Sequence, residues 1–415
     1  MKLLNKNFLF LVGSQLFSVF GTAIAQFAIS LYVLDKTGSM GIFSIVLSLS
    51  MVSRVLFLPF GGIVADRLKK RKLMIAMDFS YLIMTIGLSI GVVLENSILV
   101  LGIISILLGV VSSLETPVVQ SAIPLVCKSE DIPQANGIIN SIAMLSNLLA
   151  PVLASVIYNF QKAYIVFIVS SICFLFAVIC EILLKIEQEN IKNINGKIMK
   201  IVYLDTKETI TYLKENVIIA KIGSITFLLN LFISSFINVV IPFTARVVWE
   251  VSDESFGVMN MMFSVGGLGG SILVSVLAKK ISGRDISKML VLNSFIFLSL
   301  IFAYIGIFDK NISFWIVTII TSILLGVFTM ISVQLISYIQ MVTNNEILGR
   351  VMSFIMMISM LAMPVGQLFF GSLQKFTSGG EIAVIIGAIS LISIIISVFS
   401  NKIFNNVNLK DDILE

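Results

Sequence analysis

The sequence predicts an all-α membrane protein whose twelve transmembrane helices form two pseudo-symmetric halves of six helices each. Of the 415 residues, 58% are hydrophobic and only 12% are charged, whereas soluble domains carry about 25% charged residues. Apolar runs recur from end to end, and they are continuous rather than alternating, which excludes a closed β-barrel. The two halves of the chain also resemble each other in sequence, as described below.

Twelve apolar runs can be delimited, with ends good to a few residues. They are 7–34, 40–65, 73–94, 97–122, 133–158, 162–185, 217–244, 254–280, 286–307, 312–339, 347–373 and 380–401. Each run is long enough to cross the hydrocarbon core as a helix, which takes about 20 residues. The first run has no cleavage pattern and is too long for the core of a signal peptide.

Basic residues orient these spans. If the termini and every second loop share one face, that face carries 22 basic residues. The opposite face carries five, which are Lys36, Lys162, Arg246, Lys310 and Lys375. Because Lys and Arg concentrate on the cytoplasmic side, both termini are expected in the cytoplasm and the spans in the plasma membrane. The net charge of +5 is then a property of the loops and no sign of nucleic-acid binding.

A long loop separates the two halves. We expect an N-terminal half at 1–185, a cytoplasmic linker at 186–216, a C-terminal half at 217–402 and a cytoplasmic tail at 403–415. In the linker, Ile194, Ile198, Ile201 and Val202 fall on one helical face and lysines cover the other. This pattern is typical of a short helix on the inner membrane surface, and a plain tether is the alternative.

An internal repeat supports the division into halves. With a shift of 213 residues, GIINSIAMLSNLLAPV (137–152) lies on RVMSFIMMISMLAMPV (350–365), with six identities in sixteen positions. Pro151 then lies on Pro364. Two six-helix halves built alike are typical of secondary transporters, whose solute site lies between the halves near mid-membrane.

The loop between the second and third spans reads GGIVADRLKKRK (61–72). It resembles the loop signature of the major facilitator superfamily, in which Gly62, Asp66, Arg67 and the basic run 70–72 match, while Lys69 replaces the second Gly. Segments 112–137 and 346–371 are similar to the drug:proton antiporter branch of that superfamily, which includes macrolide-efflux proteins. The resemblance covers the whole chain and implies the major facilitator fold.

The resemblance also implies a cytoplasmic gate between the halves. In the family, the loop Asp faces the amino end of the eleventh span, where the helix dipole attracts negative charge. The expected gate residues are Gly62, Asp66, Arg67, Arg71, Gly349 and Arg350. The alternative is that these residues only shape the loop. Lys69, Lys70 and Lys72 are expected to fix the topology.

The antiporter signature of the fifth span, Gly-x-x-x-Gly-Pro-x-x-Gly-Gly, is altered in this chain. Its positions hold Ser146, Ala150, Pro151, Ala154 and Ser155. Small residues at this spacing still allow close helix packing, but the bending freedom of glycine is lost.

Charged residues inside the spans are candidate functional residues, because a charge in the bilayer core costs about 2.5–3.5 kcal/mol on insertion scales. The chain has no histidine, so proton exchange near neutral pH would need a carboxylate. Glu115 is the first candidate, with a fixed partnership to a loop base as its alternative role. Asp78 is the second candidate, or a partner of the basic loop. Arg54 either pairs with a carboxylate or lines the cavity, and Glu181 is expected at the membrane interface.

Neutral polar residues mark the spans that line the cavity in this family. Those expected there, beside Arg54, are Gln15, Gln26, Gln120, Asn230, Asn238, Gln334 and Tyr338. Each could instead form a hydrogen bond between helices.

Together these patterns predict a secondary transporter and not an enzyme. It is expected to export lipophilic small molecules, such as drugs or macrolides, by proton antiport with alternating access. No cofactor is expected beyond the proton gradient, since the phosphate-binding pattern Gly-x-x-x-x-Gly-Lys-Ser/Thr does not occur. The three cysteines, Cys127, Cys173 and Cys180, lack the spacing of a metal site.

The expected partners are the lipophilic substrate, protons and the lipid bilayer, with no nucleic acid, and the chain is expected to act as a monomer. Alternatives of the same fold are a siderophore exporter or a lysolipid flipper. An alternative of a different class is a non-transporting sensor or scaffold. A membrane enzyme is disfavoured, because the sequence shows no histidine and no paired acids.

Overall fold

The computed structural model describes residues 5–94, 98–127, 131–161, 163–186, 198–277, 283–343, 348–374 and 378–404. Within these ranges the regular secondary structure is helical, and twelve spans are long and apolar enough to cross a membrane. Each of them overlaps one of the predicted apolar runs. The predicted fold class, an all-α protein with twelve membrane-spanning helices, is therefore confirmed.

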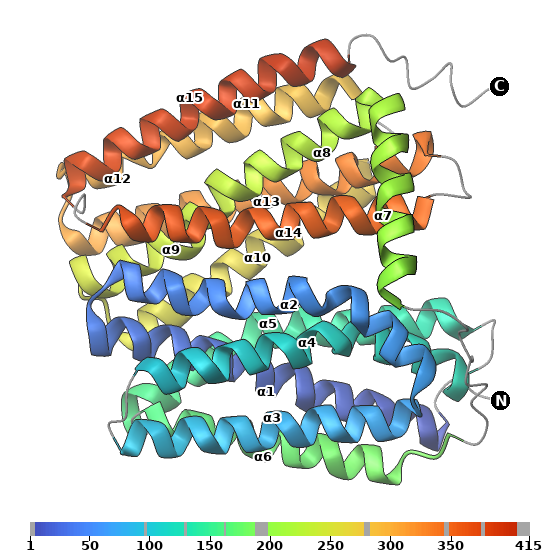
Figure 1. Ribbon diagram of the computed structural model, residues 1–415. Helices are drawn as coiled ribbons and strands as arrows, with labels where there is room; N and C mark the ends of the chain where they lie inside the picture. Colours follow the sequence, from blue (N-terminus) through green and yellow to red (C-terminus); the bar gives the residue numbers. More distant parts are fainter. Residues whose placement is uncertain are drawn as a thin grey trace. The chain divides into compact units, whose positions relative to one another are not determined.

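Residue contacts divide the chain into two compact units. The first unit contains Met1–Gly196 and Ser252–Met261. Its helices, labelled in Figure 1, are α1 (Lys6–Thr37), α2 (Met40–Arg67), α3 (Lys70–Val93), α4 (Ile98–Val126), α5 (Ile132–Gln161), α6 (Ala163–Leu183) and the start of α10 (Asp253–Leu277).

The second unit contains Lys197–Val251 and Met262–Glu415. Its elements are α7 (Ile198–Glu215), α8 (Val217–Leu229), η2 (Asn230–Ser234), α9 (Ser235–Phe243), η3 (Thr244–Val248), the rest of α10, α11 (Gly283–Ser299), α12 (Ile301–Tyr304), α13 (Lys310–Val342), α14 (Leu348–Ser372) and α15 (Gly379–Phe404). The segments η2 and η3 are π-helical turns within the seventh span, which runs from Val217 to Val248.

Local sequence explains the tight turn between the first two spans. Helix α1 ends at Gly38, whose φ of 55° is left-handed and whose N–H donates to the carbonyl oxygen of Leu34. Glycine adopts that conformation without the steric cost that other residues pay. Ser39 then caps α2, because its hydroxyl accepts a hydrogen bond from the N–H of Ile42 at 3.3 Å.

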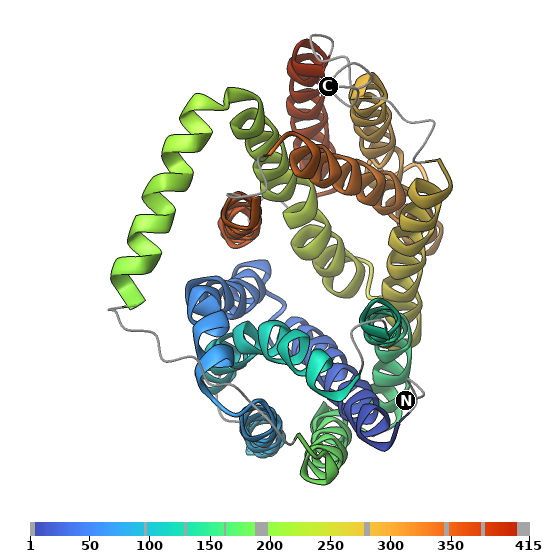
Figure 2. The ribbon, with the colours of Figure 1, turned by 90° about the vertical axis from the view of Figure 1, so that its right-hand side faces the viewer.

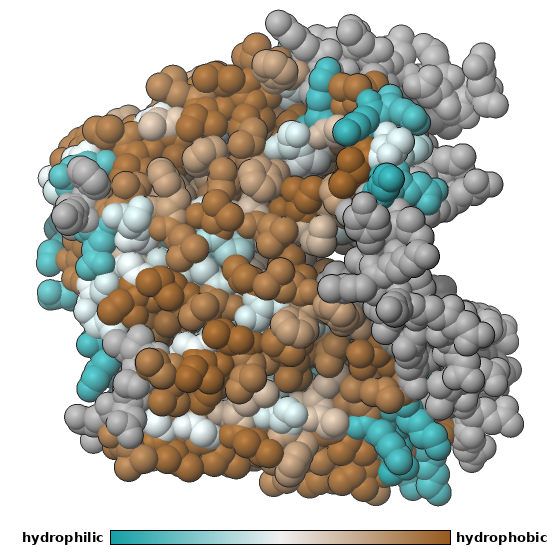
Figure 3. Space-filling model, viewed as in Figure 1, coloured by the Kyte–Doolittle hydropathy of each residue, from teal (hydrophilic) through white to brown (hydrophobic). Residues whose placement is uncertain are grey.

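Within the first unit, α1 packs on α5 and α6, α2 packs on α4, and α3 lies between α4 and α6. The crossing of α2 and α4 is very close, since a Cβ at Gly109 would collide with the carbonyl oxygen of Ser50. Many large apolar side chains point away from these contacts, as expected for helices in lipid. On the face shown in Figure 3, hydrophobic side chains cover the length of the spans and hydrophilic ones gather toward the helix ends.

The second unit has a similar close crossing, between α10 and α13. A Cβ at Gly266 or Gly270 of α10 would collide with the backbone of α13 at Ser322 or Gly326. The 213-residue shift of the internal repeat carries Gly109 onto position 322, which Ser322 occupies. The two halves therefore use equivalent crossings, with Gly109 on α4 in the first unit and with glycines on both α10 and α13 in the second.

The predicted linker contains α7, which contacts α8 and α14. Figures 1 and 2 both show α7 at the edge of the second unit, running across the direction of the spans. Ile194 of the expected helix, the side chains of Ile198, Ile201 and Val202, and the tail from residue 405 lie outside the described residues.

Candidate functional site

A cluster of polar and charged side chains lies among the spans of the first unit. Five helices supply it, namely α1, α2, α3, α4 and α6. Its members are Ser18, Arg54, Asp78, Tyr81, Glu115 and Glu181, and we call them the buried charge cluster. Charged side chains within a membrane span are costly and mark functional positions more often than not.

Asp78 of α3 occupies the centre of one part of this cluster. Only 3% of its surface is exposed, and its Oδ1 accepts a hydrogen bond of 2.7 Å from the Ser18 hydroxyl of α1. Its carboxyl group also contacts the carboxyl group of Glu181 on α6. The alternative role predicted for Asp78, pairing with the basic loop, gains no support from these recorded neighbours.

Glu181 lies in the last turn of α6 and is 1% exposed, so it is buried among the helices of the first unit, and its expected depth at the membrane interface stays a prediction. Among the described residues, its Oε2 has no hydrogen-bond partner of ordinary geometry. The ionisable groups that act most strongly on it are Asp78, Cys180 and Glu115. The structure therefore brings together two acids that the sequence did not pair, because they lie 103 positions apart.

Glu115 of α4 forms the other part of the cluster, with Arg54 of α2 and Tyr81 of α3. Arg54 acts on Glu115 electrostatically, and Tyr81 interacts with the same carboxyl group. Arg54 Nε and Tyr81 Oη are buried without a hydrogen bond of ordinary geometry. Arg54 was expected either to pair with a carboxylate or to line the cavity, and its placement beside Glu115 supports the first role.

A small recess adjoins the cluster, and Tyr81 and the predicted cavity residue Gln26 both line it. Its remaining walls are Thr22, Ala25, Leu108, Ser112 and Phe174. The recess connects the cluster to one of the expected cavity positions, within the first unit.

The other predicted cavity residues come from both units. Asn230 and Asn238 donate their amide N–H groups to carbonyl oxygens of their own span, at Thr226 and Ser234. Gln15 and Tyr338 are buried, Gln334 is half-buried, and Gln120 is exposed. Their roles in substrate binding stay predictions.

Arg71, expected at the gate, contacts the end of α6 inside the first unit. Its Nε donates to the carbonyl oxygen of Glu181 at 3.1 Å, and Nη2 donates to the carbonyl oxygen of Ile182. A cation at a helix carboxyl end satisfies free carbonyl groups and complements the helix dipole. The surroundings of the other expected gate residues are not described. These residues are Gly62, Asp66, Arg67, Gly349 and Arg350.

The small residues of the altered antiporter signature line one side of α5. Ser146, Ala150, Ala154 and Ser155 are buried, and Pro151 lies inside the helix. A Cβ at Gly257, in the first turns of α10, would collide with Ser155. Residues 252–261 belong to the second repeat by sequence, yet their contacts place them in the first unit.

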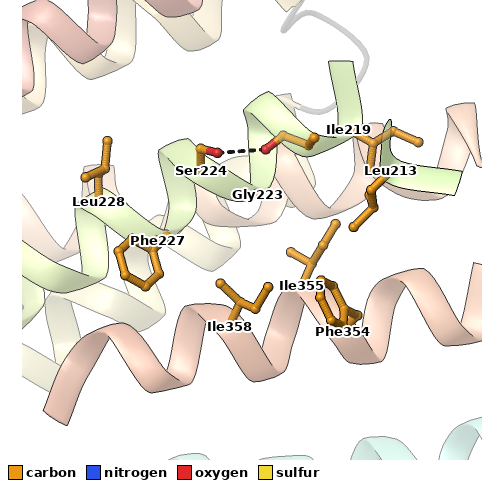
Figure 4. A pocket seen from close by; sticks show the side chains of 10 residues that line it. Leu213, Ile219, Gly223, Ser224, Phe227, Leu228, Phe354, Ile355 and Ile358 are labelled. Carbon is orange, nitrogen blue, oxygen red and sulfur yellow. Dashed lines mark hydrogen bonds between the residues drawn. The ribbon is translucent and has the colours of Figure 1, made fainter. Parts of the chain in front are cut away.

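The second unit contains an apolar crevice of about 430 Å³ between α7, α8 and α14 (Figure 4). Phe227 of α8 and Ile355 and Ile358 of α14 point into the space between these helices. Its hydroxyl-bearing residue, Ser224, donates to the carbonyl oxygen of Ala220 on its own helix at 2.9 Å. The crevice thus offers hydrocarbon contacts to a ligand.

Sequence reasoning missed Ser18, Tyr81 and Glu181 as members of the charge cluster. One signal was available for Tyr81, which follows Asp78 by three positions and so lies on the same face of α3. The position of Glu181, two residues before the end of its helix, did not point to a partnership with Asp78. Ser18 is one of many serines in the spans and gave no signal of its own.

Comparison with known proteins places the chain among transporters. The family model described as the Major Facilitator Superfamily matches residues 11–367. Macrolide efflux protein A of Streptococcus pyogenes is 23% identical over 363 residues, covering 85% of this chain and 86% of that protein. The staphyloferrin A transporter of Staphylococcus aureus is 26% identical over 373 residues, which cover 87% of this chain and 89% of that protein.

Solved structures with the same fold include transporters of several substrates. A bacterial homolog of the human lysosomal transporter Spinster superposes with a TM-score of 0.74 at 11% identity, covering 97% of this chain and 98% of that one. A D-xylose–proton symporter superposes with a TM-score of 0.70 at 12% identity, covering 95% and 96%.

Proposed function

Because the chain belongs to the major facilitator superfamily, we propose that it exports a lipophilic small molecule by alternating access, driven by proton antiport. Proteins of this family are multi-pass membrane transporters and not enzymes. We place the protein in the plasma membrane with both termini in the cytoplasm, acting as a monomer with the proton gradient as its energy source. The proposed partners are the substrate, protons and lipid.

The observation that carries the proton coupling is the buried charge cluster. Three acids, Asp78, Glu115 and Glu181, lie within membrane spans, and Arg54 lies beside one of them. Such groups are costly in a bilayer, so their presence there supports a functional role. Without histidine, carboxylates are the side chains that could exchange a proton near neutral pH.

The lipophilic substrate is supported by the apolar crevice and by the relative named for macrolide efflux. A wide apolar wall with few polar groups suits a ligand bound mainly through its hydrocarbon surface. A siderophore is the second candidate, favoured by the relative named as a staphyloferrin A transporter. Lysolipid is a third ligand that the crevice could accept.

Transport assays in inside-out vesicles test this proposal. Uptake of a macrolide, other lipophilic drugs, a siderophore and a lysolipid should be measured with a proton gradient and after an ionophore has collapsed it. Gradient-dependent uptake of a lipophilic drug is expected. The proposal would be overturned if the siderophore were the only compound taken up, or if uptake were the same with and without the proton gradient.

Filling the crevice tests its part in substrate binding. A Cβ at Gly223 makes only ordinary contact with Ile355, so the extra carbons of Gly223→Leu should occupy the crevice. Gly387→Leu is the matched control, because a Cβ there meets nothing within 4 Å. The Gly223 variant should raise the substrate concentration needed for half-maximal transport, and equal behaviour of the two variants would remove the crevice from the binding site.

A further inference from the structure

Asp78 and Glu181 form a pair of buried carboxyl groups on neighbouring helices. They are 3% and 1% exposed, and their carboxyl groups contact each other across the interface of α3 and α6. An ionised carboxylate can only accept hydrogen bonds. Among the described residues, the Oε2 of Glu181 has no hydrogen-bond donor that would stabilise it as an anion.

Two carboxylates in contact cannot both stay ionised away from water, because like charges repel and burial removes their solvation. A single proton between them resolves the conflict, since one group then donates to the other. The Ser18 hydroxyl already donates to Asp78 at 2.7 Å. Asp78 is therefore the better acceptor, and the proton belongs on Glu181.

Among the described residues, no basic side chain is a recorded partner of the pair, and Glu115 of α4 adds a like charge that acts on both acids. From α3, Arg71 directs its guanidinium to the backbone carbonyl groups at the end of α6. From α2, Arg54 acts on Glu115 of α4 and on Tyr81. From α6, Cys180 is a neighbouring thiol, and α1 contributes the neutral Ser18.

We propose that Asp78 and Glu181 bind one exchangeable proton between them, and that this pair, rather than Glu115, releases the proton during transport. In the loaded state the Glu181 O–H donates to the Asp78 carboxylate. Release breaks that O–H bond and passes the proton to water, which leaves two negative charges on the pair. Release therefore requires a transport state in which water reaches and solvates the two carboxylates. The transport role rests on the proposed proton-coupled export, whereas proton binding by the pair does not.

Proton binding can be measured on the purified full-length protein without any substrate. Infrared difference spectra between acidic and alkaline buffer report buried carboxylic acids, and a pH electrode counts the protons released. The isosteric variant Glu181→Gln should lose one infrared acid band and release one proton fewer than wild type. The double variant with Asp78→Asn should lose no further proton, because the pair holds a single one.

Glu115→Gln and Glu381→Gln are the matched controls, the first within the cluster and the second at an exposed helix start. Both should keep the wild-type acid band. Loss of that band in Glu115→Gln, or its survival in Glu181→Gln, would overturn the inference. So would displacement of the proton by sodium ions. If Glu181→Gln does not fold, wild type and Glu115→Gln still decide between the two sites.

Transport measurements separate this inference from the proposed function. In vesicles, Glu181→Gln should still equilibrate the substrate but fail to concentrate it. If wild-type export is independent of the proton gradient while the acid band titrates as described, the proposed proton-coupled export is refuted. Proton binding by the pair is then still supported. If export is proton-coupled and Glu181→Gln pumps normally, the pair has no part in coupling.

Discussion

Arg54 and Glu115 are opposite charges that come from two different spans of the first unit. Each offsets the electrostatic cost of the other, so removing one partner leaves an uncompensated charge in a poorly solvated place. This arrangement gives Glu115 a structural reason to be present, beside the proton-carrying role expected from the sequence. The two roles make different predictions for the same variants.

If Glu115 serves as the partner of Arg54, Glu115→Gln should lower the free energy of unfolding by about 1–3 kcal/mol. Adding Arg54→Gln should recover part of that loss, because no unpaired charge remains. Thermal unfolding of the four proteins in a double-mutant cycle measures this coupling. A stable Glu115→Gln protein that binds drug but cannot concentrate it would instead identify Glu115 as the proton carrier.

Arg71→Ala should destabilise the protein by about 1.5–3 kcal/mol, because hydrogen bonds from a charged donor to the end of α6 are lost. Arg71→Lys should restore only part of the stability, since an ammonium cannot reproduce the forked guanidinium contact. Thermal unfolding is the measurement, with the exposed neighbour Lys72→Ala as control. Unchanged stability with impaired transport would favour the gate role expected from the loop signature.

The close helix crossings of the second unit depend on single glycines. A Cβ at Gly270 of α10 would collide with the Gly326 carbonyl oxygen of α13, whereas a Cβ at Gly269 meets nothing within 4 Å. Gly270→Ala should therefore cost about 1–3 kcal/mol of stability through overpacking. Gly269→Ala should be close to neutral or slightly stabilising in the same unfolding measurement. Equal stability of the two variants would contradict this expectation and show that α10 can move enough to accommodate the added methyl group.

At the scale of the whole molecule, the distribution of basic residues predicts the orientation in the membrane. The 22-to-five bias predicts that both termini lie in the cytoplasm. Reporter fusions at Glu415 and within the 308–311 loop should label opposite sides of the membrane. Labelling of the same side would contradict the predicted topology.

The cytoplasmic gate is also a property of the whole molecule, since it is expected to join the two halves. Asp66→Asn should preserve folding, because the amide has the size of the carboxylate. Loss of a charge–dipole contact of about 0.3–2 kcal/mol would shift the balance of transport states between about twofold and thirtyfold. Transport rate at equal expression is the measurement, and full activity would refute the gate.

The sequence by itself determined the class, the number of spans and the family resemblance. These depend on local properties, namely the length and apolarity of each run and the loop signature beside Asp66. The repeat that aligns Pro151 with Pro364 is likewise readable without a structure, and both prolines lie inside helices.

Only the tertiary structure decided which polar groups meet. Glu181 and Asp78 are 103 positions apart, and Arg71 contacts a helix end 110 positions away. The reason is physical: lipid is as apolar as a protein core, so a membrane helix can be apolar on every side. The rotation of each helix about its axis then leaves little trace in the hydrophobic pattern. Packing against neighbouring helices sets that rotation, and it places Glu181 against Asp78.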